Sequence, residues 1–333
     1  MPILNKNDKD AVAGYNEFVR SSPHTHTMQD MSWAEVKNNW SSDYIYLEEN
    51  GKITAAMSVL GIKAVDDKTF LYAPRGPVCD FYDTDTVKAL IEEAKPLFEK
   101  HNAFLLRLDP CVKRDEELAD KYRSLGYDFR ADGTEIHSFS NPRYEIMLTI
   151  KNKTPDEIKA GFNSMTKRHI KASEKNGVIN RYGRSQAEID IFFELHKEMA
   201  DRQGITYRPK EYFERLVNAF PELRIYTSEY EGEMIGAMMG LPYGDCMWYV
   251  YGGTKTMRGA KVSPGYLLIW DLIKWGAELG LDYFNMGGTY SLDMEDGLFF
   301  FKHGFCKADE PFVWVGELDV VLDREAYEKF IKK

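Results

Sequence analysis

The chain has 333 residues, with 43 Lys and Arg against 53 Asp and Glu, which gives a formal net charge of −10. This length is enough for two domains with buried cores, and an apolar share of 44% excludes a disordered chain. The acidic balance excludes a protein whose main task is to coat nucleic acid or anionic membrane, but it leaves room for a small basic contact with RNA.

Targeting and metal signals are missing from the sequence. The N-terminus has no basic and apolar segment of the secretory kind, and no apolar run approaches the roughly 18 residues of a membrane-spanning helix. The four cysteines lie far apart without a CxxC pair, which indicates neither a zinc site nor a disulfide framework. We therefore expect a soluble cytoplasmic protein without a metal ion.

An internal repeat with an offset of about 180 residues organises the chain. Residues 45–57 and 225–238 each predict strand, turn and strand, and residues 70–73 align with 247–250 as a third strand. Each half then enters an amphipathic helix and returns to a strand, at residues 103–108 and 281–286. This pattern predicts a duplicated α/β unit with mixed sheets.

We place the first domain at residues 1–145 plus 317–333 and the second at residues 146–316. The segment 141–143, before a strand at 144–150, is a candidate hinge, and the last strand, residues 313–321, is expected to return to the first half.

Capping signals predict three helices. Ser32 with Glu35 opens a helix over residues 33–40, and Thr154-Pro155 with Glu157 opens one that Gly177 closes. Ser185 with Glu188 opens a third helix, which Gly204 ends.

Lys37 lies between Trp33 and Trp40 at helical spacing, so a charge interrupts an aromatic stripe. A lysine in such a place either covers apolar surface with its methylenes or contacts a phosphate or carboxylate. Arg208 precedes Pro209, which fits the first position of a helix, so we expect the guanidinium at a helix cap beside free N–H groups. The alternative is an ordinary surface arginine.

Lys302 is embedded among aromatic residues in the segment 298–305. It either reaches solvent past its neighbours or, if buried beside a reacting carbonyl, stabilises an oxyanion. Asp109 ends a predicted strand and either accepts a proton from an amine or starts the next turn. His303 is a weaker acid or base candidate because the sequence offers it no partner.

A basic face on an otherwise acidic protein comes from four residues of the helix capped at Thr154: Lys167, Arg168, Lys171 and Lys175. Such a face is either solvated or contacts RNA. The sequence contains no HExxH, GxSxG or Walker motif, which sets several common hydrolase and nucleotide-binding chemistries aside.

Taken together, these motifs resemble the FemABX peptidoglycan-bridge aminoacyltransferases, and specifically the short FemX type. The resemblance covers nearly the whole chain, because the segments at residues 1–5, 33–40, 204–212, 248–251 and 301–303 stand in the expected order. It implies two tandem acetyltransferase-like (GNAT) domains. The segment 151–204 has no heptad pattern for the coiled-coil arm of the FemA type.

The resemblance also implies an activity. Members of this type transfer an amino acid, often alanine, from aminoacyl-tRNA to the side-chain amine of the lysine in UDP-MurNAc-pentapeptide, which starts an interpeptide bridge. No further cofactor is implied. The sequence leaves open whether alanine, serine or glycine is transferred, and we expect a monomer.

Site residues follow from the same resemblance. Lys37 and Arg208 would hold the UDP diphosphate, while Lys302 would stabilise the oxyanion with Phe301 beside the RNA acceptor end. Asp109 would face the attacking amine. The substrate channel would be lined by Thr206, Tyr212, Tyr251 and Trp40.

One departure from the family concerns Phe104, which stands where close relatives carry a tyrosine five residues before the aspartate. It predicts that Asp109 lacks a hydroxyl partner. Two other functions stay open: an acetyl-CoA-dependent GNAT acyltransferase, for which residues 258–265 loosely approximate a pyrophosphate loop, and a non-catalytic protein that binds the UDP precursor.

Overall fold

The computed structural model describes residues 3–131, 141–257, 259 and 261–332. The chain forms two compact units, residues 1–143 with 313–333 and residues 144–312. These boundaries differ by two to four residues from the expected ones, at 145 and 316. Met1 and Pro2 of the N-terminal motif lie outside the described residues.

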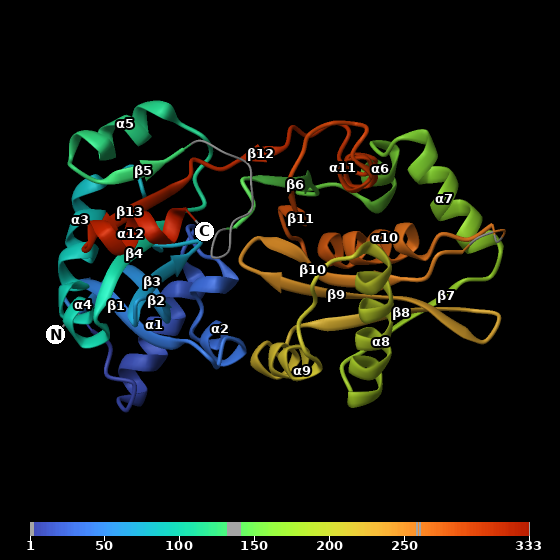
Figure 1. The fold of residues 1–333 in the computed structure, drawn as a ribbon. Coiled ribbons are helices and arrows are strands. Elements are labelled where there is room, and N and C mark those ends of the chain that lie inside the picture. Colours follow the sequence, from blue (N-terminus) through green and yellow to red (C-terminus); the bar gives the residue numbers. More distant parts are fainter. Residues whose placement is uncertain (1–2, 132–140, 258, 260, 333) are drawn as a thin grey trace. The chain divides into compact units, whose positions relative to one another are not determined.

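The first unit contains a six-stranded sheet in the order β1-β2-β3-β4-β13-β5 (Figure 1). Its elements are α1 (Lys9–Ser21), the 3-10 turn η1 (Thr27–Gln29), α2 (Met31–Val36), β1 (Ser41–Glu49), β2 (Lys52–Val65), β3 (Lys68–Pro74), α3 (Thr84–Glu93), α4 (Lys95–His101), β4 (Ala103–Asp109), α5 (Glu116–Ser124), β5 (Asp128–Arg130), β13 (Glu317–Val321) and α12 (Arg324–Ile331).

The second unit contains a seven-stranded sheet in the order β12-β6-β11-β10-β9-β8-β7. Its elements are β6 (Tyr144–Thr149), α6 (Pro155–Ala160), α7 (Ser164–Lys175), β7 (Ile179–Gly183), α8 (Gln186–Gln203), α9 (Lys210–Ala219), β8 (Arg224–Tyr230), β9 (Glu233–Tyr243), β10 (Cys246–Thr254), α10 (Pro264–Glu278), β11 (Tyr283–Thr289), α11 (Gly297–His303) and β12 (Phe312–Val313).

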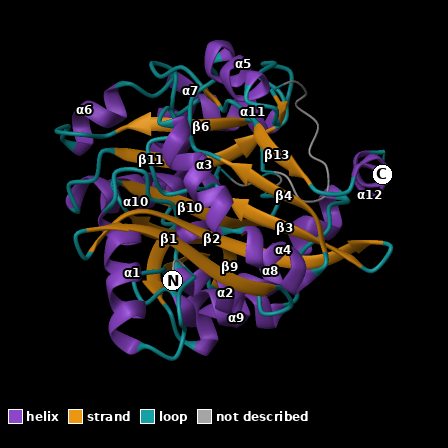
Figure 2. Ribbon diagram, turned by 90° about the vertical axis from the view of Figure 1, so that its left-hand side faces the viewer, coloured by secondary structure: helices purple, strands orange, loops and turns teal. Residues whose placement is uncertain are grey.

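The predicted duplication is present in both sheets. The strands β1, β2 and β3 pair antiparallel and β3 pairs parallel with β4, and the same pattern recurs in β8, β9, β10 and β11. In the first unit two helices, α3 and α4, make the crossover where the pattern predicts one. The last strand does return to the first unit: β13 pairs with both β4 and β5, and Figure 2 shows β3, β4 and β13 following one another in one sheet.

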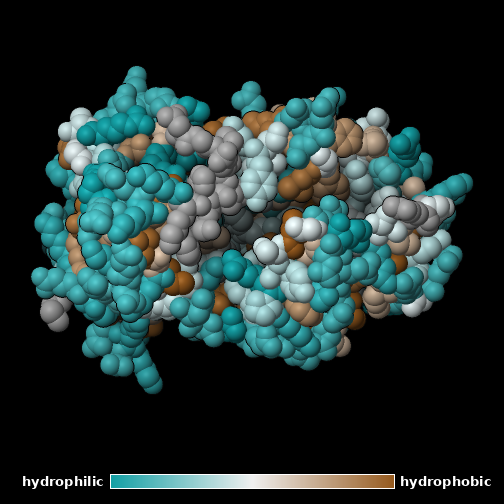
Figure 3. All heavy atoms as spheres, viewed as in Figure 1, coloured by the Kyte–Doolittle hydropathy of each residue, from teal (hydrophilic) through white to brown (hydrophobic). Residues whose placement is uncertain are grey.

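Each sheet has helices on both faces. In the first unit α3 and α5 pack on one face around Leu90 and Tyr122, and α12 packs on the other through Tyr327. In the second unit α10 covers one face through Leu268 and Leu272. The helix α8 packs on the opposite face so closely that a Cβ at Gly253 would lie 2.5 Å from the backbone of His196. Hydrophilic residues cover most of the visible face of each unit in Figure 3.

Two helix predictions need correction. The helix expected over residues 33–40 is α2, which begins two residues earlier because Asp30, not Ser32, accepts the hydrogen bond at its N-terminus. It ends at Val36, so Lys37 and Trp40 follow the helix. The helix from Thr154 to Gly177 is broken into α6 and α7, because Asn163 caps a new start after Gly161.

Other local predictions are confirmed. Thr154 and Glu157 form the expected capping box, as do Ser185 and Glu188 at the start of α8. Gly204 ends α8 in the left-handed conformation. Residues 151–204, all of them described, hold α6, α7, β7 and α8, and β7 pairs with β8, so this segment is not a helical hairpin arm.

Candidate active site

Lys302 lies near the C-terminus of α11, a helix that Asp296 caps by accepting a hydrogen bond from the N–H of Phe299 at 2.7 Å. Only 4% of the lysine is exposed, so its ammonium does not reach past its neighbours into solvent. The Nζ donates to the carbonyl oxygen of Gly288 in β11 at 2.6 Å. Burial lowers the pKa of Lys302 to about 8, against the opposing charge of Glu145.

The strands β10 and β11 separate beside this lysine. They pair in parallel only where residues 246–248 meet residues 283–285, although β10 continues to Thr254 and β11 to Thr289. In the first unit, by contrast, β3 and β4 stay paired from Thr69 and Ala103 through to Pro74 and Asp109. The two copies of the repeat therefore differ at this place: the strands stay paired to their ends in the first unit, and their pairing stops early in the second.

Phe301 contributes an apolar wall next to Lys302. Its ring is half-buried and makes T-shaped contacts with two other rings. The centroid of Tyr266 lies at 4.9 Å and that of Phe305 at 5.6 Å. Since Tyr266 lies in the first turn of α10, the wall joins α11 to α10.

The turn before α10 is where a GNAT enzyme would hold a pyrophosphate. Two of its polar groups are already hydrogen-bonded: Ser173 Oγ of α7 accepts from the N–H of Ser263 at 2.8 Å, and Asn176, the C-cap of α7, donates to the carbonyl of Lys261 at 3.2 Å. Pro264 removes a further N–H from the first turn of the helix. Arg258 and Ala260 of the expected loop lie outside the described residues.

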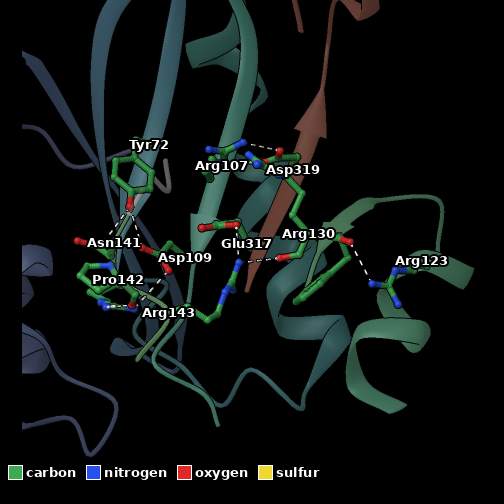
Figure 4. Close-up of polar contacts among 12 residues, drawn as sticks. Tyr72, Arg107, Asp109, Arg123, Arg130, Asn141, Pro142, Arg143, Glu317 and Asp319 are labelled. Carbon is green, nitrogen blue, oxygen red and sulfur yellow. Dashed lines mark hydrogen bonds and ion pairs between the residues drawn. The ribbon is translucent and has the colours of Figure 1, made fainter. Parts of the chain in front are cut away.

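Asp109 ends β4 in the first unit and is 3% exposed (Figure 4). The hydroxyl of Tyr72, from β3, donates to its Oδ2 at 2.7 Å, and the amide of Asn141 donates to the same oxygen. Arg75 lies 3.5 Å from Oδ1. The carboxylate is therefore held as part of a network and does not start a turn.

The structure corrects the prediction drawn from Phe104. Its ring is buried among apolar residues, with Phe330 at 5.4 Å between centroids. A hydroxyl partner for Asp109 nevertheless exists, because Tyr72 supplies it from the neighbouring strand. Burial, with the charge of Asp109, raises the pKa of Tyr72 well above its ordinary value, so the hydroxyl stays a donor.

Further buried charges follow Asp109 across the same sheet (Figure 4). Glu317 of β13 pairs with Arg143 at 3.2 Å, and burial raises the pKa of this glutamate, helped by the charge of Asp109. Beyond it, Arg107 donates two hydrogen bonds of 2.7 Å to Asp319.

Lys37 caps the C-terminus of α2, and its Nζ lies 5.6 Å from the centroid of Trp33. The predicted aromatic stripe on one helix face is wrong for Trp40, because α2 ends before this residue. The ring of Trp40 packs against Phe70 instead, with 6.4 Å between centroids. Phe70 stacks on Tyr72 at 5.4 Å, so a row of aromatic rings leads from Trp40 toward Asp109.

Arg208 lies one residue before the N-cap of α9, which is Pro209, and not at the cap itself as predicted. Its guanidinium carbon lies 5.7 Å from the ring centroid of Tyr212. Tyr212 in turn accepts a hydrogen bond of 3.3 Å from the hydroxyl of Tyr251, on β10. Thr206 and Arg208 are exposed in the loop between α8 and α9, while Tyr212 is buried beneath it.

The predicted residues thus form separate groups. Lys302 and Phe301 lie together in the second unit, as do Arg208, Tyr212 and Tyr251, whereas Lys37, Trp40 and Asp109 belong to the first unit. The sequence did not point to Tyr72 or Asn141. Their link to Asp109 depends on the pairing of β3 with β4 and on the path of the chain at residue 141, which no local pattern encodes.

Sequence comparison bears on the whole chain. Residues 11–230 match the model of the FemAB family, and residues 161–302 match an acetyltransferase (GNAT) domain. A protein of Weissella viridescens named UDP-N-acetylmuramoylpentapeptide-lysine N(6)-alanyltransferase is 39% identical over 341 aligned residues, covering 100% of both chains.

The chain belongs to the FemAB family. This confirms the family predicted from the motifs. A lipid II:glycine glycyltransferase of Staphylococcus epidermidis is 28% identical over 62% of this chain and 51% of that protein.

Solved structures agree with the tandem GNAT fold. A crystal structure of FemX has a TM-score of 0.87 at 18% identity and covers 99% of each chain. A tandem GNAT protein from the clavulanic acid biosynthesis pathway has a TM-score of 0.54 at 12% identity, covering 96% of this chain and 97% of that one. Among the described residues of this FemAB protein, no helix is long and apolar enough to cross a membrane.

Proposed function

We propose that this chain transfers an aminoacyl group, with alanine as the first candidate, from aminoacyl-tRNA to the side-chain amine of the lysine in UDP-MurNAc-pentapeptide. This reaction starts an interpeptide bridge of peptidoglycan. The full-length relative named as an alanyltransferase supports this choice of substrates. The structural observation that carries the proposal is the buried ammonium of Lys302 beside the opening between β10 and β11.

The chemistry needs this cation. The neutral amine attacks the ester carbonyl of the aminoacyl-tRNA, and the carbonyl oxygen becomes negative as the N–C bond forms. The ester C–O bond then breaks, and the ribose oxygen leaves with a proton while the nitrogen loses one. A fixed positive charge at the oxyanion lowers the barrier by about 3 to 4 kcal/mol, and more effectively where water is excluded.

The second unit offers a place for the acyl donor. The separated edges of β10 and β11 carry backbone groups that can orient the aminoacyl ester, and Phe301 offers a ring against which the RNA acceptor end can stack. The exposed basic side chains of α7, which are Arg168, Lys171 and Lys175, with the half-buried Lys167, are the proposed RNA contact.

The acceptor roles are assigned residue by residue. Lys37 in the first unit and Arg208 in the second are proposed as diphosphate contacts, since each presents a cation against an aromatic ring. Asp109 is proposed to orient the attacking amine. Contacts with the rest of the precursor are proposed for Thr206, Tyr212, Tyr251 and Trp40.

The two alternatives have less support. An acetyl-CoA enzyme would use the turn before α10, whose N–H at Ser263 already donates to Ser173. A protein that only binds the precursor gains nothing from the cost of burying the ammonium of Lys302. A cytoplasmic location is part of the proposal, because both proposed substrates are cytoplasmic molecules, and a monomer is proposed with it.

The test is a radiolabel-transfer assay with UDP-MurNAc-pentapeptide and tRNAs charged separately with alanine, serine and glycine. Wild type should transfer alanine, and Lys302→Met should lose about 100-fold or more in kcat because the oxyanion loses its counter-charge. Lys307→Met, which removes an exposed lysine five positions away, should keep full activity. Equal rates for wild type and Lys302→Met would exclude the oxyanion role, and no transfer from any charged tRNA would exclude the ligase.

A further inference from the structure

A buried polar network lies behind Lys302 and has no part in the chemistry described above. Asn285 of β11 is fully buried, and Glu145 of β6 is 5% exposed. The Nδ2 of Asn285 donates to Oε2 of Glu145 at 2.9 Å, while its Oδ1 accepts from the N–H of Gly287 at 2.6 Å. Asn285 thus joins the carboxylate of Glu145 to the backbone of β11 next to Gly288, whose carbonyl accepts the hydrogen bond from Lys302.

That segment is a bulge in β11. Asn285 pairs with Met147 and Gly288 with Glu145, so three steps along β11 match two along β6. Gly287 has φ +76, in the left-handed region that favours glycine, and a Cβ there would lie 3.8 Å from Nζ of Lys302. The bulge turns the Gly288 carbonyl to the ammonium, and Glu145 stands directly across the ladder from Gly288.

Three titratable side chains act on the pKa of Lys302. Glu145 on β6 is the buried acid, Asp296 at the N-cap of α11 is half-buried, and Cys306 follows α11. Burial raises the pKa of the Cys306 thiol, which is therefore neutral. Burial lowers the pKa of Lys302, and the charge of Glu145 is the largest effect that raises it again.

We propose that Asn285 and Glu145 are positioning residues for Lys302: Asn285 fixes the bulge that presents the Gly288 carbonyl, and Glu145 supplies the negative charge that keeps the lysine protonated. Their effect on catalysis rests on the proposed role of Lys302. Without the cation at working pH, a neutral amine would face the developing oxyanion and could not stabilise it.

The first measurement is independent of turnover. Proteins labelled with 15N at lysine side chains are titrated by NMR, and the Lys302 signal is assigned by its loss in Lys302→Met. In wild type it should titrate near pH 8, since burial lowers the pKa of Lys302 to about 8. In Glu145→Gln, which keeps an acceptor for Asn285 but removes the charge, it should titrate about one pH unit or more lower. Glu229→Gln, a carboxylate on β8 paired with Arg181, is the matched control and should leave the titration unchanged.

The second measurement is the pH profile of kcat/KM. The protonated lysine is the active form, so the rate falls as pH rises through the pKa of Lys302. The fall should begin at lower pH in Glu145→Gln, return toward wild type in Glu145→Asp, and stay in place in Glu229→Gln. Asn285→Ala should lower kcat about tenfold or more with little change in the KM for the UDP precursor.

Unaltered titration of Lys302 in Glu145→Gln would overturn the role of Glu145, and unaltered kcat in Asn285→Ala would overturn that of Asn285. If instead Lys302→Met transfers at the wild-type rate, the proposed function of Lys302 is wrong while the NMR titration still decides the charge relation. Should Glu145→Gln fail to fold, Asn285→Ala still decides the role of Asn285. For Glu145 the decision then passes to Glu145→Asp, whose carboxylate is one methylene shorter: Lys302 should titrate slightly below wild type, and a titration identical to wild type would overturn the charge role.

Discussion

At the scale of single residues, Asp109 shows how a carboxylate can be held for orientation. Its Oδ2 accepts hydrogen bonds from Tyr72 and Asn141, and Arg75 faces its Oδ1. A carboxylate has about four acceptor sites, so Oδ1 keeps room to accept a hydrogen bond from the substrate amine while the network holds the group in place. Orientation of the acceptor amine is the role that we propose for Asp109.

Removal of the Tyr72 hydroxyl tests this arrangement. Tyr72→Phe leaves a buried carboxylate with one donor fewer, which should cost about 1 to 3 kcal/mol in unfolding free energy and lower kcat. Tyr82→Phe is the control: Tyr82 makes the same kind of bond to Asp115 at 3.1 Å but is 51% exposed, so its loss should cost less than about 0.5 kcal/mol. Urea denaturation measures the unfolding free energy and transfer kinetics measure kcat. Equal losses of unfolding free energy in Tyr72→Phe and Tyr82→Phe would show that the buried bond to Asp109 stabilises the protein no more than the exposed one.

At the scale of elements, the end of α8 and the start of α9 set the positions of the proposed binding residues between them. Gly204 ends α8 with φ +67 and opens the loop that carries Thr206 and Arg208 to the start of α9. Nothing lies within 4 Å of a Cβ at this position, so the glycine is required by its backbone conformation and not by space.

Two glycine-to-alanine changes should therefore have opposite signs. Gly204→Ala forces a side chain into the left-handed region, which should cost about 1 kcal/mol and raise the KM for the UDP precursor. Gly14→Ala, in the middle of α1 and also without a neighbour within 4 Å, should stabilise by about 0.5 to 1 kcal/mol and leave the KM unchanged. Thermal melting and steady-state kinetics measure both; a stabilised Gly204→Ala would contradict the backbone argument.

At the scale of the whole molecule, the first unit is built from two distant stretches of chain. The strand β13 inserts between β4 and β5, so the sheet is complete only when the C-terminal segment has returned. The fully buried pair of Arg107 on β4 and Asp319 on β13 fastens this strand, and Tyr327 donates a further hydrogen bond to Asp319 at 2.9 Å.

Breaking that pair should destabilise the first unit. Arg107→Met leaves Asp319 buried without its guanidinium, which should cost about 3 to 5 kcal/mol. In hydrogen exchange with mass spectrometry, peptides of β4 and β13 should exchange faster, whereas peptides of α10 in the second unit keep their rates. Arg324→Met, which breaks the exposed pair with Asp128, should cost about 1 kcal/mol or less. Faster exchange throughout both units in Arg107→Met would mean that the units do not unfold separately.

Local sequence determined the repeat, the order of strands within each half, the capping boxes at Thr154 and Ser185 and the end of α8 at Gly204. These features depend on side-chain periodicity and on hydrogen bonds between residues three positions apart, so a short window contains them. The sequence does not show which of two nearby capping residues starts a helix. Asp30 therefore caps α2 where Ser32 was predicted, and Asn163 starts a second helix where one continuous helix was predicted after Thr154.

Tertiary structure alone decided the partners of the buried charges. Tyr72 and Asp109 are 37 residues apart, and Glu145 and Asn285 are 140 residues apart. Each pair meets because strands pair across a sheet, and a buried polar group must find its partner wherever the fold brings one. The sequence shows that Lys302 lies among aromatic residues. Its hydrogen bond to the carbonyl of Gly288 depends on the bulge in β11, which only the folded sheet contains.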